Sequence, residues 1–272
     1  DGMAFFSAGL LVWMLLCPST AMDAASAACA LFVHSVLPAL FPYMTAVRML
    51  RGRVRPQSIG AYLLLGWAGG SPNGALLSQT APRQNRRLAV QCATMSPIFL
   101  AGTLGVWLQS SSAAALVLFS VLLGGFLTGL LVREKAEDAA LPSSSALPVS
   151  LVEAIESSAR AMLMVCGTLV MMRVLAALLC EVLANFPGLC LAITTVLEVT
   201  SGASLLARMP WPMGFRVALL AAATGFGGVA ILLQNRAAMP RQLFSLPAQI
   251  GYQVLHALLS GLIALGMWTL GC

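Results

Sequence analysis

Charged residues are scarce in this sequence: only 9% of its 272 residues are Asp, Glu, Lys or Arg. A soluble domain carries roughly 25% charged residues. The mean hydropathy of +0.90 points the same way, because apolar residues dominate the whole chain rather than one part of it. The composition therefore excludes an ordinary soluble domain and indicates a protein of the lipid bilayer.

Residues that bind metals or act as nucleophiles are also few. The chain has two histidines, His34 and His256, and seven cysteines without a Cys-x-x-Cys pair. We interpret the cysteines as small apolar packing residues and both histidines as satisfied core residues. The sequence has no phosphate-binding loop, ATP-binding signature or nucleophile–base pair in its loops. We therefore expect no enzyme activity, no metal and no cofactor.

The net charge of +6 is not typical of a nucleic-acid interface in this setting. The arginines lie in short loops between apolar segments and have no aromatic residues interleaved with them. Orientation in the membrane explains this placement better than a nucleic-acid partner, which we do not expect.

Apolar stretches of about 20 residues recur along the chain, which matches a hydrocarbon core of about 30 Å crossed at about 1.5 Å per residue. We predict an all-helical polytopic membrane protein with about seven transmembrane helices and two re-entrant helical hairpins. The first stretch is short and also resembles a cleaved secretory signal, although it lacks a basic n-region. The predicted segments are 3–17, 27–50, 59–81, 87–108, 113–132, 156–181, 187–207, 214–235 and 249–270.

The chain interrupts its apolar segments in the same way twice. Gly74-Ala75 corresponds to Gly202-Ala203, 128 residues later, and Ser96-Pro97 corresponds to Thr224-Gly225. Paired interruptions in two halves are a sequence indicator of a transporter's binding site. We predict two repeats, each built of a helix, a hairpin, a broken helix and a helix. The predicted domains are 1–26 (helix and loop), 27–133 (first repeat), 134–155 (cytoplasmic linker) and 156–272 (second repeat).

The segments 59–81 and 187–207 are better explained as hairpins than as spans. Dividing 59–81 at residues 69–74 leaves arms of about ten residues, or about 15 Å, which reach only the middle of the bilayer. Backbone that turns there must face protein or a water-filled cavity, because lipid cannot satisfy its polar groups. Two such tips meeting at the midplane would make a polar pocket.

The distribution of basic residues supports this topology. If both hairpins return to the side from which they enter, twelve of the fifteen basic residues fall on one face, which is then cytoplasmic together with the N-terminus. Three crossings per half place the halves in opposite orientations, the inverted-repeat plan of many secondary transporters. The twelve residues are Arg48, Arg51, Arg53, Arg55, Arg83, Arg86, Arg87, Arg133, Lys135, Arg160, Arg236 and Arg241.

Two charged residues lie deep inside apolar segments, Glu198 and Arg173. A charge within the membrane is costly, so a functional role with a nearby partner is the default hypothesis. Glu198 either binds substrate or a coupling ion, or serves structurally as a hairpin cap or in an ion pair with Arg173. The long side chain of Arg173 could also snorkel to the interface or contact an anionic substrate.

Hydroxyl and amide side chains at the two predicted tips complete a candidate site, and glycines there would let backbone approach a ligand closely. A helix N-terminus beyond each tip would offer free amide groups to an anion. Taken singly, each residue could simply make a turn or a kink, but the paired set favours a site. The predicted substrate-binding residues are Ser71, Asn73, Gly74, Ser96, Glu198, Thr200, Ser201, Gly202, Gly225, Gly227 and Gly228.

Six motifs occur in a characteristic order, at residues 35–42, 70–75, 96–99, 198–202, 225–228 and 255–256. In this order they resemble the nucleoside-recognition, or Gate, domain membrane proteins, and within them the sporulation integral membrane proteins of the YlbJ type. The resemblance covers about residues 28–268. It implies a fold similar to concentrative nucleoside transporters and movement of dipicolinic acid across the outer forespore membrane. The family pattern commonly has polar residues where this chain has Leu76, Met95, Ala230 and Leu232.

We therefore expect a permease for a small anionic or heteroaromatic metabolite, with dipicolinate as the leading substrate. It would work by alternating access at a midplane site, with a proton or cation as a coupling partner. The alternatives are a nucleoside or nucleobase permease and a non-transporting sporulation membrane scaffold. The expected location is the bacterial cytoplasmic membrane or the outer forespore membrane, and an oligomer is compatible with the sequence.

Overall fold

The computed structural model is all-helical in the part of the chain that it describes, residues 2–51, 53, 59–77, 85–133, 149–239 and 243–271. Within these residues, five helices are long and apolar enough to cross a membrane. They indicate an integral membrane protein. The five are Pro18–Arg51, Ser111–Leu130 (α8), Leu151–Val182 (α9), Met213–Ala238 and Leu246–Thr269 (α14).

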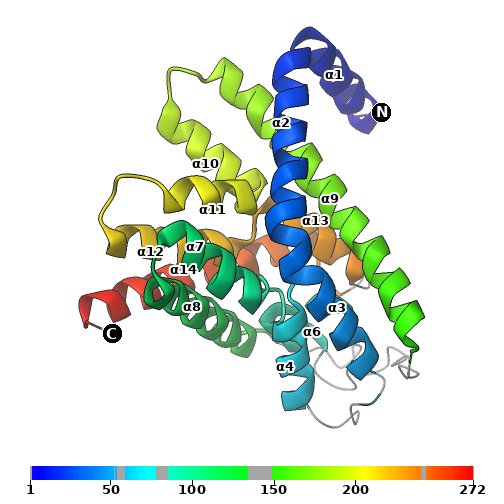
Figure 1. Cartoon of the computed structure of the whole chain (residues 1–272), viewed down its shortest axis with the longest axis vertical. Coiled ribbons are helices and arrows are strands. Elements are labelled where there is room, and N and C mark those ends of the chain that lie inside the picture. The colour runs from blue at the N-terminus through cyan, green and yellow to red at the C-terminus, as the bar shows by residue number, and fades with distance from the viewer. Residues whose placement is uncertain are drawn as a thin grey trace.

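The chain begins with α1 (Gly2–Leu16) and continues into a 34-residue helix built of three parts, α2 (Pro18–Leu31), the π-helical turn η1 (Phe32–Val36) and α3 (Leu37–Arg51). Proline inside α3 loosens the backbone ladder, because it lacks an amide donor. Figure 1 shows this helix running beside α9, against which it packs. The sequence predicts a loop before residue 27, but residues 18–26 are helical, since this stretch is rich in alanine.

Shorter helices fill the rest of each half. The first half contains α4 (Ile59–Gly69), α5 (Asn73–Leu77), α6 (Asn85–Gln91), a second π-helical turn η2 (Phe99–Thr103) and α7 (Leu104–Leu108). The second half contains the short helices α10 (Pro187–Leu197) and α11 (Val199–Ala207). They are followed by α12 (Met213–Phe226) and α13 (Gly228–Ala238), which together make up the long segment Met213–Ala238.

Helix α9 begins at Leu151, earlier than the predicted residue 156, because a capping box precedes it. The hydroxyl of Ser150 accepts a hydrogen bond from the Glu153 amide, and the Glu153 carboxylate accepts one from the Ser150 amide at 2.7 Å. Residues 151–155 are therefore helical rather than part of the predicted 134–155 linker. The rest of that linker up to residue 148, and the predicted basic residues Arg55, Arg83, Lys135 and Arg241, lie outside the described residues.

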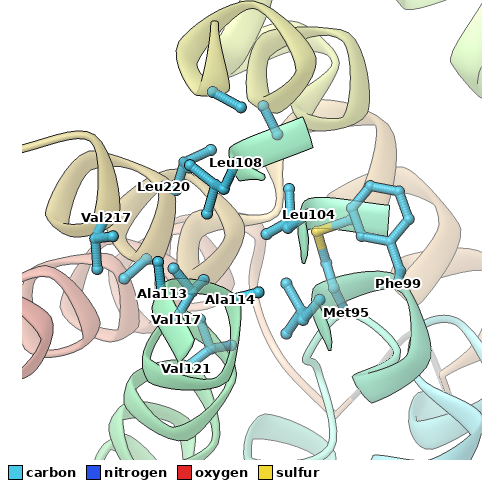
Figure 2. Packing of buried hydrophobic residues seen from close by; sticks show 14 of the residues in the cluster. Met95, Phe99, Leu104, Leu108, Ala113, Ala114, Val117, Val121, Val217 and Leu220 are labelled. Carbon is cyan, nitrogen blue, oxygen red and sulfur yellow. The ribbon is translucent and has the colours of Figure 1, made fainter. Parts of the chain in front are cut away.

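The largest apolar cluster joins α7, α8, α11, α12 and α14. Figure 2 shows side chains of this cluster converging from α7, α8 and α12, with Met95 and Phe99 at one end. Helix α14 approaches closely through small residues, as is typical of membrane helices. A methyl group on Gly225, for example, would lie 2.8 Å from the Ser260 hydroxyl. Close packing against α14 therefore accounts for glycine at this position.

Candidate functional site

An internal cavity of about 40 Å³, which we call the central cavity, gathers residues from both halves of the chain. It has room for about three water molecules. Four predicted site residues line it: Ser71, Ser96, Glu198 and Thr200. The other lining residues are Val36, Leu40, Met95, Phe99, Val165, Leu169, Ala230, Ile231 and Gln234.

In the first half, the junction between α4 and α5 rests on the non-helical stretch that follows α6. The Ser71 amide donates a hydrogen bond to the Thr94 carbonyl at 2.8 Å. Gly70 has a φ of +60°, and a Cβ there would lie 2.7 Å from the Ser96 amide nitrogen, so both conformation and space require glycine. The Ser96 hydroxyl donates to the Ala39 carbonyl at 3.4 Å. The buried Ser71 hydroxyl has no partner among the described residues.

In the second half, Glu198 is the single residue between α10 and α11. Its carboxylate oxygens accept hydrogen bonds from the amides of Thr200 at 2.7 Å and Ser201 at 2.6 Å. A carboxylate at a helix N-terminus satisfies free amide donors and is favoured by the helix dipole. Only 2% of Glu198 is exposed. Of the two roles predicted for Glu198, the structure shows the cap, while its side chain also lines the central cavity.

The break between α12 and α13 lies against this same junction. Gly227 and Gly228 have φ values of +77° and +75°, which side chains other than glycine rarely adopt. A Cβ on Gly228 would lie 3.1 Å from the Val196 carbonyl oxygen and 3.2 Å from the Val199 amide nitrogen. In each half, therefore, the backbone at an interrupted long segment contacts the backbone between two short helices.

Several predicted site residues do not line the central cavity but pack next to it. Gly74 lies inside α5 against the Cys92 backbone, and Gly202 lies inside α11 against Thr195 of α10. Asn73 is buried beside Gly69, and its amide nitrogen has no partner among the described residues.

Ser201 contributes its backbone amide to the Glu198 cap. Gly225 packs against Ser260, as described above, and Gly227 forms the C-cap of α12. The fourteen-residue helix α12 thus ends at Phe226, within the predicted break at residues 225–228.

Arg173 is not brought to Glu198. It lines a different, open cavity of about 810 Å³ between α9, α10 and α11, together with Cys180, Glu181 and Thr194. Among the described residues, the Glu198 carboxylate contacts backbone amides and no basic side chain.

The sequence prediction missed Gln234, which lines the central cavity. Its Nε2 donates a hydrogen bond to the Thr168 hydroxyl at 2.6 Å, which joins α13 to α9. A usable signal was present: Gln234 lies two helical turns after Gly227 and one turn after Ala230, so these positions share a face of α13.

The ring of His256 has a hydrogen-bonding partner within the core, as the sequence predicts. Its Nε2 lies 2.8 Å from the Val121 carbonyl, inside the packed region between α8 and α14. In the part of the chain that the structure describes, no three His, Cys, Asp or Glu side chains gather in a way that could hold a metal ion.

Comparisons with known proteins return no match: no family model, no curated protein and no solved structure is similar to this chain at a significant level. The resemblance to the Gate domain proteins therefore stays a prediction from its motifs.

Proposed function

We propose that this chain is a membrane permease for a small heteroaromatic or anionic metabolite, built as an inverted repeat around two re-entrant hairpins, α4–α5 and α10–α11. One observation carries the proposal. Each half of the chain has a junction between two short helices and a break in a longer segment. All four features meet at the central cavity.

The lengths of the short helices support the hairpins. Helices α4 and α10 have 11 residues each, so each spans about 16 Å at about 1.5 Å per residue. That is about half of a hydrocarbon core of about 30 Å. Each is followed by another short helix that packs against it, α5 against α4 and α11 against α10. A chain that enters, turns at mid-depth and returns would have this arrangement.

Transport would require the hairpin tips to separate from the broken helices. The central cavity of about 40 Å³ is far smaller than ligand pockets, which hold about 300–1,000 Å³. In the proposed mechanism this arrangement is a closed state. Opening it would break the Ser71–Thr94 and Trp67–Gln91 hydrogen bonds and separate Gly228 from the α10–α11 junction.

The charge of the central cavity bears on the substrate. Among the described residues that line it, Glu198 alone is charged. The amides of Thr200 and Ser201 already bind that carboxylate, so they are not free for an anion. A dicarboxylate such as dipicolinate, which the sequence resemblance suggests, would need a proton or cation to accompany it. We therefore include such a coupling ion in the proposal.

The same observation favours a second candidate, a nucleoside or nucleobase. A neutral ligand needs no accompanying cation. Its hydrogen-bonding groups could pair with side chains of the lining residues. The Glu198 carboxylate could accept, and the Gln234 amide and the hydroxyls of Ser71, Ser96 and Thr200 could accept or donate.

Uptake into proteoliposomes tests the proposal. We expect saturable uptake of radiolabelled dipicolinate, lowered on the order of tenfold or more by Glu198→Gln, because a hydrogen-bonded charge contributes that much. Glu156→Gln is the matched control, since Glu156 pairs with Arg160 on the exposed surface of α9. Competition by unlabelled nucleoside would assign the second candidate. A folded protein that moves neither labelled dipicolinate nor labelled nucleoside would favour the scaffold and overturn the permease.

A further inference from the structure

Two cysteines from neighbouring helices face each other at one end of the molecule. Cys180 lies near the end of α9 and Cys190 near the start of α10, ten positions later. The Cys180 sulfur is 3.5 Å from the Cys190 carbonyl oxygen, and the Cys190 sulfur is 3.7 Å from the Cys180 carbonyl oxygen. Each thiol therefore lies against the backbone of the other cysteine, and a disulfide needs such closely spaced backbones.

The fold holds this pair together without help from the sulfurs. Helices α9 and α10 pack against each other, and a short turn joins them. The Cys190 sulfur also lies 3.4 Å from the carbonyl of Leu183 in that turn. Closing a bond between the thiols therefore needs little movement of the backbone.

Both thiols can be reached by reagents. Each is partly exposed, and both line the open cavity of about 810 Å³ that also contains Arg173. Cys92, by contrast, is completely buried. In the proposed topology the α9–α10 turn lies on the face opposite the arginine-rich loops, outside the cytoplasm, where disulfides form and persist.

We propose that Cys180 and Cys190 are a redox site that forms a reversible disulfide between the end of α9 and the start of α10. One thiolate attacks the disulfide of a thiol–disulfide oxidoreductase or of a small disulfide, and releases one of its sulfurs as a thiolate. The second cysteine then attacks the resulting mixed disulfide and releases the other sulfur. The pair loses two electrons and two protons, and the donor disulfide gains them and leaves as two thiols.

The bond would restrain the helix that ends at Glu198. Helix α10 runs from Pro187 to Leu197, so a covalent tie at Cys190 limits how far it can move relative to α9. This consequence rests on the proposed function, in which the α10–α11 hairpin moves. The disulfide itself does not depend on transport and is measured separately.

Peptide mapping of the purified full-length chain tests the bond. Trypsin leaves both cysteines in one peptide, residues 174–208, because no Lys or Arg lies between them. After treatment with oxidised glutathione, denaturation and N-ethylmaleimide, we expect this peptide to carry no maleimide and to be lighter by two hydrogens than the unmodified peptide. After dithiothreitol it should carry two maleimides.

Two variants serve as controls. Cys180→Ser leaves Cys190 without a resolving thiol, so its peptide should carry one glutathione or one maleimide and no internal bond. Cys29→Ser should leave the oxidation of the 174–208 peptide unchanged. Two free thiols after oxidation, or a bond from Cys180 to a cysteine outside this peptide, would overturn the proposal. If the oxidant leaves uptake unchanged in a chain that is shown to carry the disulfide, that result would reject only the proposed restraint on transport.

Discussion

At the scale of single residues, Glu198 shows how one carboxylate can be structural and still face a cavity. Its two oxygens satisfy two amides at the start of α11, and the residue is buried away from bulk solvent. Removing the carboxylate leaves these donors without partners, whereas a glutamine retains one acceptor.

We therefore expect Glu198→Ala to lower the free energy of unfolding by about 1–3 kcal/mol, and Glu198→Gln to lower it less. Thermal unfolding of the purified protein in detergent would measure both. Glu156→Ala on the exposed face of α9 should change stability little, because it breaks only a surface ion pair. If Glu198→Ala were as stable as the parent, the Glu198 cap would contribute nothing to the stability of the fold.

Gly228 is the second residue whose replacement has a defined expectation. A side chain at its φ of +75° costs about 1–2 kcal/mol, and the added Cβ would press on the backbone of Val196 and Val199. Gly228→Ala should therefore lower the melting temperature and impair uptake. Gly167→Ala in α9, where a Cβ meets no atom within 4 Å, is the matched control. Equal effects of both variants would contradict a special role for the break between α12 and α13.

At the scale of elements, helices and their interruptions could be predicted from the sequence, but not always the residue at which a break occurs. The match between Gly74-Ala75 and Gly202-Ala203 predicted a tip near Gly202, yet the chain turns at Glu198 and Gly202 lies inside α11. The reason is that a glutamate side chain can cap a helix that follows it, which an apolar pattern does not reveal. The Ser-x-x-Glu signal before α9, in contrast, was present in the sequence.

Contacts between elements were less predictable still. A helix that is apolar all round gives no information on how it is rotated about its axis. The sequence therefore could not show that Arg173 lies away from Glu198, or that Cys180 and Cys190 face each other rather than only filling space.

The capping box of α9 allows a prediction at this scale. Ser150→Ala removes the hydroxyl that accepts from the Glu153 amide, which costs about 1 kcal/mol at an N-cap. Hydrogen exchange should become faster in the first turn of α9 and stay unchanged in the middle of the helix. Ser157→Ala, inside the same helix, should leave the first turn as protected as in the parent. Unchanged exchange in Ser150→Ala would mean that packing alone holds this end.

At the scale of the whole molecule, the hairpin topology makes a claim that side-specific labelling can decide. If α4–α5 returns to its side of entry, only the segment α6–α7 and helix α8 cross between Arg53 and Arg133, so these two residues lie on one face. Ser112, at the start of α8, lies on the other face. If α4–α5 instead spanned the membrane, Arg53 and Ser112 would share a face and Arg133 would be opposite.

All three side chains are exposed, so cysteines placed there should react with a membrane-impermeant maleimide. In a chain without other cysteines, we expect Ser112→Cys to be labelled in intact cells, and Arg53→Cys and Arg133→Cys only after the membrane is opened. This pattern follows because basic loops stay in the cytoplasm and an odd number of crossings inverts the second half. If Arg53→Cys and Arg133→Cys were labelled from opposite sides, α4–α5 would span the membrane and would not be a re-entrant hairpin. The inverted repeat, and the closed midplane site built on it, would then fail with it.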